Sequence, residues 1–152
     1  MDIQQRRSFV DSRIPVEMKF RQCCQKNYLS ATLQDRDEFN SEEFYISVGS
    51  REILAVFKAG EKDTPEDRAF DIYIPKNIET GYYELNSPDQ LIEIALTEKF
   101  PTYTSYWAFK GAMDLVVNAD KQDYSGTFNV RFKDKENREF ISEAKFAFSV
   151  EA

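Results

Sequence analysis

Residues 140–150, near the carboxyl terminus, alternate between two faces of an extended chain. The even-numbered positions place three phenylalanines, Phe140, Phe146 and Phe148, on one face. Side chains alternate across a strand, whereas a helix would scatter these rings around its circumference. We therefore predict a long strand here. Residues 133–138 carry five charged side chains and are predicted to be the turn of a hairpin with the strand before it.

The same period of two recurs along most of the chain. It predicts further strands over residues 16–21, 28–33, 44–48, 53–57, 70–74, 82–85, 91–97, 103–110, 113–117 and 128–132. The apolar positions of 53–57 also fit one face of a helix, and 91–97 is ambiguous in the same way. Gly49 and Ser50 are predicted to form a tight hairpin turn. Residues 118–126, rich in Asn, Asp, Ser and Gly, predict a longer turn.

About ten short strands at this spacing predict an antiparallel β-sandwich, with a flattened β-barrel as the alternative topology. A second sheet is needed because a single sheet cannot leave one apolar face in water. The length of 152 residues fits one ordinary domain whose core needs no disulfide or metal. We expect an N-terminal arm over 1–14 and a single domain over 15–152. No apolar run approaches the ~18 residues of a transmembrane segment.

Charge is unevenly distributed along the chain. The formal net charge is −7, and because nucleic-acid binding needs a basic surface, nucleic acid is not an expected partner. The first 27 residues nevertheless carry six basic and three acidic side chains. This basic arm could engage an acidic partner, lie on its own domain or remain disordered. The acidic remainder favours a basic partner, since complementary charge speeds encounter and rejects wrong partners.

Cys23 and Cys24 are the only cysteines. Adjacent residues of a strand point to opposite faces, so the two sulfurs cannot bridge without distortion. We expect free thiols, which fit a reducing compartment. A reactive thiol would need a cation nearby, and a buried thiol in the core is the alternative. Residues 1–14 lack the apolar segment of a signal peptide, which predicts a cytoplasmic protein, or an exported one if the sequence lacks its leader.

The chain contains no histidine. This excludes Ser-His-Asp and Cys-His catalysis and histidine-ligated metals. Neither of the glycine-rich phosphate-binding patterns, GxxxxGK[ST] and GxGxxG, is present. A glycosidase needs only two carboxylates at the right separation, but spacing does not distinguish any pair among 27 acids. A carboxylate-based glycoside hydrolase is therefore an alternative without assigned catalytic residues.

Two acidic segments could hold calcium, which prefers several hard oxygen ligands from a flexible loop. One is the predicted loop at 35–43, and the other lies in the predicted turn at 118–126. The candidate ligands are Asp35, Asp37, Glu38, Asp120 and Asp123. Neither segment has the spacing of an EF-hand. The alternative is that these charges keep sheet edges from pairing with other molecules. No cofactor other than calcium is expected.

Residues 103–109 form the most aromatic stretch. One face of the predicted strand offers Tyr103, Trp107 and Phe109, and we expect that face to be core, which leaves Tyr106 outside. Tyr106 would then lie near tyrosines of neighbouring strands. Exposed tyrosines with an acidic rim suit a sugar or a protein. The candidate ligand-binding residues are Tyr73, Tyr82, Tyr106 and Trp107, and the alternative is that all four pack in the core or at its rim.

A Gly-Tyr strand start at 81–83, a later strand led by Gly111 and a Ser-Gly-Thr-Phe segment at 125–128 together resemble small β-sandwich domains. The resemblance implies the fold and no function. The sequence predicts a non-catalytic binding or protein-interaction module for a protein or small ligand, such as an inhibitor or immunity-type protein with a basic partner. The hydrolase and a calcium-dependent, lectin-like or adhesion domain are the alternatives.

Overall fold

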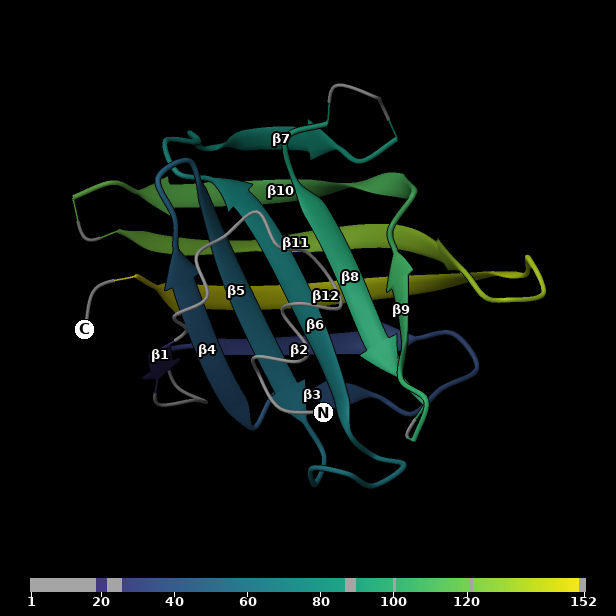
Figure 1. Cartoon of the computed structure of the whole chain (residues 1–152). Helices are drawn as coiled ribbons and strands as arrows, with labels where there is room; N and C mark the ends of the chain where they lie inside the picture. Colours follow the sequence, from purple (N-terminus) through teal and green to yellow (C-terminus); the bar gives the residue numbers. More distant parts are fainter. Residues whose placement is uncertain (1–18, 22–25, 87–89, 100, 121, 151–152) are drawn as a thin grey trace.

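The computed structural model describes residues 19–21, 26–86, 90–99, 101–120 and 122–150. Over these residues the chain forms two six-stranded antiparallel sheets, packed face to face with strands that cross steeply (Figure 1). This confirms the predicted antiparallel β-sandwich. The sheets are not closed into a barrel. Among the described residues, none forms a helix with the length and hydropathy that crossing a membrane requires.

We call the sheet that begins with β1 the first sheet. Its strands, in spatial order, are β1 (Lys19–Arg21), β4 (Glu43–Val48), β5 (Glu52–Ala59), β6 (Arg68–Pro75), β8 (Glu93–Glu98) and β9 (Thr104–Trp107). The second sheet runs β3 (Phe39–Asn40), β2 (Tyr28–Leu33), β12 (Glu139–Ser149), β11 (Asp123–Lys133), β10 (Lys110–Asn118) and β7 (Gly81–Glu84). Each predicted strand has a counterpart among the described residues, although the one predicted over 103–110 is shorter, as β9. The extra one, β3, lies where a loop was predicted, because Phe39 enters the core there.

The inner faces of the two sheets form one apolar core. Phe140, Phe146 and Phe148 are buried on the inner face of β12, which confirms the face predicted from their alternation. Rings also meet across the layers, as where Phe148 of the second sheet meets Phe57 of the first edge-on, with centroids 6.1 Å apart. Such pairs add about 0.5–1.5 kcal/mol each beyond the burial of their area. The aromatic inner faces therefore hold the two sheets together.

The predicted turn at 118–126 is wrong over its second half. β10 ends at Asn118 and β11 begins at Asp123, so residues 123–126 are strand. Gly126 is a strand residue, and glycine is needed there because the backbone of β10 passes very close. A Cβ on Gly126 would lie 2.1 Å from the backbone oxygen of Asp114. Glycine in a strand often marks such a close approach and not a turn.

The faces predicted for residues 103–109 are reversed. Tyr106 is buried in the core, whereas Trp107 is 38% exposed on the outer face of the first sheet. The seven residues do not form one strand, since Tyr103 has a φ of 41° before β9 begins. The chain then crosses to the second sheet, where the backbone N–H of Phe109 donates to the Arg131 carbonyl. A single alternating pattern cannot extend through two such changes of direction.

Several predictions fall outside the described residues. These are the N-terminal arm at 1–14, the beginning of the first predicted strand, and both cysteines.

Candidate functional site

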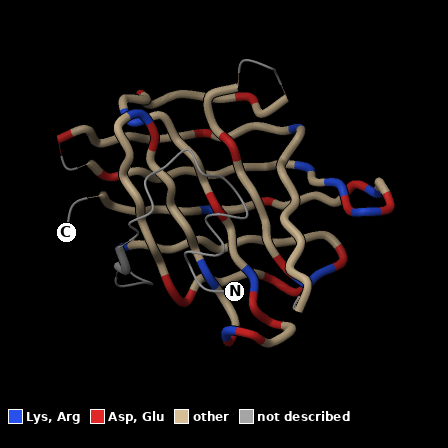
Figure 2. Tube along the Cα trace, viewed as in Figure 1, with Lys and Arg blue, Asp and Glu red and all other residues tan. Residues whose placement is uncertain are grey.

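Connections from both sheets meet at one corner of the sandwich. They join β2 to β3 (34–38), β5 to β6 (60–67), β8 to β9 (99–103) and β11 to β12 (134–138). We call these four connections the charged corner. Figure 2 shows how densely charged residues follow one another there, compared with the mostly uncharged strands. A hollow of about 510 Å³ lies between them and is lined by residues from all four parts, among them Asp35, Pro65, Lys99 and Asp134.

Arg36 forms the floor of this hollow. Its Nε donates to Oε1 of Glu98 at 2.9 Å, and both side chains are largely buried. The guanidinium lies over the Phe140 ring, 3.7 Å from its centroid. The planar guanidinium can stack and donate at once, so Arg36 joins the β2–β3 connection to the first sheet through Glu98 and to the second sheet through Phe140.

A second polar contact fixes the β5–β6 and β8–β9 connections. The Tyr103 hydroxyl donates to Oδ2 of Asp67 at 2.7 Å, and Lys58 Nζ lies 3.8 Å from Oδ1 of the same carboxylate. Partial burial, together with the bond to Asp67, raises the pKa of Tyr103. The phenol therefore stays protonated as a donor, and these two connections are tied by side chains as well as by backbone.

The β11–β12 turn is closed by Asp134. Its Oδ1 accepts the backbone N–H groups of Glu136 and Arg138, each at 2.9 Å. The backbone bond from Arg138 lowers the pKa of Asp134. Hydrogen bonds to a carboxylate favour its charged form, so Asp134 stays ionised, and it pairs with Arg138 of the same turn at 3.2 Å.

Acidic side chains outnumber basic ones at the charged corner. Its connections carry nine acidic and five basic residues. The exposed acids that are not engaged in holding the loops include Asp37, Glu38, Glu61 and Glu66. The connections at the opposite corner, 49–51, 76–80 and 119–122, carry two acidic and three basic residues. Of these two corners, the charged corner is therefore the one with a surplus of acids.

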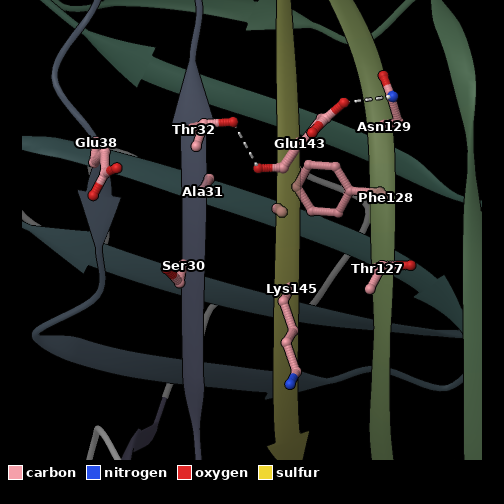
Figure 3. Close-up of a pocket in the computed structure, with 10 residues that line it drawn as sticks. Ser30, Ala31, Thr32, Glu38, Thr127, Phe128, Asn129, Glu143 and Lys145 are labelled. Atoms are coloured by element: carbon pink, nitrogen blue, oxygen red, sulfur yellow. Dashed lines mark hydrogen bonds between the residues drawn. The ribbon is translucent and has the colours of Figure 1, made fainter.

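The outer face of the second sheet carries a shallower hollow of about 460 Å³ (Figure 3). Short polar side chains such as Ser30, Thr32 and Thr127 line it, with Glu143 and Lys145 projecting beside them. Glu143 accepts a hydrogen bond from Asn129 at 3.1 Å. Glu38 and Lys145 add one acidic and one basic side chain to the dispersed hydroxyl groups of this open surface.

A third cleft, of about 330 Å³, lies at the corner opposite the charged one. It is lined by residues of both sheets, among them Val48, Ile53, Val117, Tyr124 and Val150. Burial raises the pKa of the Tyr124 hydroxyl. Lys76, Asn77, Glu79 and Gln122 also line the cleft, so it combines apolar area with a mixed set of polar groups.

The structure does not bring the four predicted aromatic ligand residues together. Tyr73 is buried on the outer face of the first sheet, where its ring stacks on Trp107 with centroids 5.9 Å apart. Tyr106 points into the core, against Phe140. Tyr82 is 64% exposed, but it lies on β7 of the other sheet. The predicted platform of neighbouring exposed tyrosines is therefore wrong.

The predicted metal ligands lie at two separate corners. Asp35, Asp37 and Glu38 belong to the β2–β3 connection, whereas Asp120 and Asp123 lie at the β10–β11 turn. Within the described ranges no three His, Cys, Asp or Glu side chains are grouped as metal ligands would be. The backbone oxygens of Asp37 and Glu38 accept instead from the guanidinium of Arg68, at 2.9 and 2.8 Å.

Sequence reasoning missed the residues that hold the charged corner together, Arg36, Glu98, Tyr103 and Asp67. The one available signal was Arg36 standing alone among five acids in residues 35–43. A single cation in an acidic loop is expected to form ion pairs. The partner of Arg36, Glu98, is 62 residues away, so the local sequence does not identify it. Comparisons with known proteins add no function: no family model, no curated protein and no solved structure matches this chain.

Proposed function

We propose that this protein is a non-catalytic binding module that holds a basic protein partner at the charged corner. The observation that carries the proposal is the convergence of loops from both sheets on one hollow with a surplus of carboxylates. Binding residues are disproportionately found on loops that a rigid scaffold positions. Carboxylates gathered at one corner would steer a basic partner toward that corner and disfavour acidic ones.

The internal contacts of the corner support a surface that is organised before binding. Arg36 holds one connection through Glu98, and Tyr103 holds two others through Asp67. A preorganised surface loses less conformational freedom when a partner binds. An inhibitor or immunity-type protein needs this property, because it must compete with the natural ligand of its target.

The geometry supports binding over hydrolysis. In the hollow, Glu98 pairs with Arg36 and Asp134 with Arg138, while Glu139 pairs with Arg131. A glycosidase needs a general acid whose pKa is raised, but the pKa of Asp134 is lowered. Trp107, the aromatic residue expected beside a saccharide site, does not line the hollow.

Two variants with equal net charge test the proposal. The corner variant carries Asp37→Asn, Glu38→Gln, Glu61→Gln and Glu66→Gln. The control variant carries Glu79→Gln, Glu84→Gln, Asp114→Asn and Asp120→Asn, which are exposed acids away from the corner. Wild type and both variants are immobilised and used to recover proteins from a lysate of the source organism, at low and at raised salt.

We expect wild type and the control variant to recover the same basic protein, with recovery falling as salt rises. The corner variant should bind it roughly tenfold or more weakly, since four exposed charge contacts of about 0.6 kcal/mol each, the middle of the usual range, sum to about 2.4 kcal/mol, and ~1.4 kcal/mol is a tenfold change. Equal loss in both variants, or recovery that salt leaves unchanged, would contradict the assignment of the corner.

A further inference from the structure

The two outer faces of the sandwich differ in chemistry. On the second sheet the outward side chains of β11 and β12, such as Thr127, Glu143 and Lys145, are polar and exposed (Figure 3). On the first sheet the outward residues of β5 and β6 form a separate apolar cluster of Leu54, Val56, Ala69 and Tyr73, with exposures of 0–2%. The centre of the outer face of the first sheet is therefore as buried as a core.

The register shows that this cluster lies outside the sandwich. Leu54 pairs with Tyr73 and Val56 with Asp71 across β5 and β6. Their neighbours Ile53, Phe57 and Ile72 point inward and belong to the main core. The described strands all belong to the two sheets, and none packs over this face. Side chains this deeply buried must be covered, so the cover comes from beyond the described part of the chain.

Residues 1–18 are joined by the chain to an edge of this sheet, and they are long enough to supply the cover. They lead directly into β1, the edge strand of the same sheet, where Lys19 pairs with Ile46 of β4. An extended segment of 18 residues reaches ~60 Å. Crossing six strands spaced by about 4.8 Å needs only ~24 Å. The segment can therefore span the whole outer face.

The composition of the segment complements the face. It contains Ile3, Phe9, Val10 and Ile14 together with Arg6, Arg7 and Arg13. The face offers an apolar centre and several acidic side chains. Asp71 is buried in the middle of it, while Glu52 and Glu93 are half-buried to either side. A buried carboxylate needs a compensating charge or hydrogen bonds, and arginine is the cation best suited to a buried pair.

We propose that residues 1–18 pack across the outer face of the first sheet, with their apolar residues on the Leu54–Tyr73 cluster and their arginines at its acids. The segment thereby closes a face that would otherwise attract a second copy of the chain, since exposed apolar patches of this kind promote association. The inference is independent of the binding function proposed for the charged corner, because the two surfaces share no residues.

Hydroxyl-radical footprinting of the full-length chain tests this proposal. Tyr73 and Leu54 report on the outer face, exposed Tyr82 is the positive reference, and buried Phe146 is the negative reference. The test variant carries Phe9→Asp and Val10→Asp. Its matched control carries Gln4→Asp and Gln5→Asp, which adds the same charge to the same segment without removing an apolar residue. Sedimentation gives the molar mass of each sample.

We expect a monomer in which Tyr73 is as protected as Phe146, both in wild type and in the glutamine variant. In the Phe9/Val10 variant, labelling of Tyr73 and Leu54 should rise several-fold toward the level of Tyr82, while Phe146 stays protected. If that variant also loses protection at Phe146, Phe9→Ala replaces it, with a smaller rise at Tyr73 expected.

Three results would overturn the proposal. The first is a Tyr73 already labelled in the wild-type monomer. The second is protection that neither Phe9 variant changes. The third is a wild-type dimer whose dilution exposes Tyr73, which would assign the face to a second copy of the chain.

Discussion

Arg36 illustrates how much one side chain can organise in this protein. It makes an ion pair of 2.9 Å with Glu98 and lies over the ring of Phe140. Removing one partner from a buried pair is costly, because the remaining charge stays buried without compensation. The shape of the charged corner therefore depends on a residue that stands among acids in the sequence, and not on the acids alone.

The inward phenylalanines should carry much of the stability. Phe146 is fully buried, with the rings of Phe128 and Phe148 each 6.2 Å away between centroids. We expect Phe146→Ala to lose about 3–5 kcal/mol in the free energy of unfolding, the usual range for a buried phenylalanine. Lys145→Ala, on the exposed face of the same strand, should stay within about 0.5 kcal/mol. Urea denaturation measures both, and a loss below ~1 kcal/mol for Phe146→Ala would contradict the burial.

At the residue scale, alternation in the sequence predicted correctly which face of a long strand is buried. It predicted the wrong face for Tyr106 and Trp107, where the chain bends on both sides of β9. The alternation in residues 140–150 extends over eleven residues of a single strand, so it identified the buried phenylalanines. The strand that holds Tyr106 and Trp107 has only four residues. A period of two needs more positions than that, and the aromatic residues flanking β9 belong to other parts of the chain.

At the scale of elements, the step from β9 to β10 carries the chain from one sheet to the other. Gly111, the second residue of β10, has a φ of 125°. A Cβ at this position would lie 2.2 Å from the backbone oxygen of Asn129. Strands that change sheets in crossed packings do so through bends of this kind. Glycine is required here for its backbone conformation and for the close approach of β11.

Gly111→Ala should therefore destabilise the fold. A strained backbone costs about 1–3 kcal/mol, and the clash with a backbone atom cannot be relieved by moving a side chain. Gly81→Ala is the matched control, because a Cβ there would meet only the Tyr83 ring, at 3.5 Å. We expect thermal unfolding to show a clearly lower midpoint for Gly111→Ala and little change for Gly81→Ala. Equal midpoints would mean that the bend is not built as described.

Hairpins joined by short polar turns were the elements easiest to predict. The turn between β4 and β5 closes where Gly49 and Ser50 indicated, with the N–H of Gly49 donating to the Glu52 carbonyl at 2.8 Å. β3 was missed, since its two residues are too few to show a period. The start of β11 was missed because glycine and serine suggest a turn, whereas Gly126 here permits close strand contact.

At the scale of the whole molecule, charge and apolar surface are segregated. Nine acids meet five basic residues at the charged corner, whereas outward residues of β5 and β6 form a buried apolar cluster on the first sheet. The net charge of −7 indicated a basic partner but gave no location. The location depends on which loops meet in space, and contacts such as Tyr103 with Asp67 join residues 36 positions apart. A pattern read along one chain does not contain that information.

The rate at which the recovered basic partner associates, measured against ionic strength, tests the central claim most directly. Steered association slows as salt screens the charges. We predict a steep fall in the association rate for wild type and for the variant neutralised at Glu79, Glu84, Asp114 and Asp120. The variant neutralised at Asp37, Glu38, Glu61 and Glu66 should show a distinctly shallower fall. The same slope for both variants would contradict a binding surface at the charged corner.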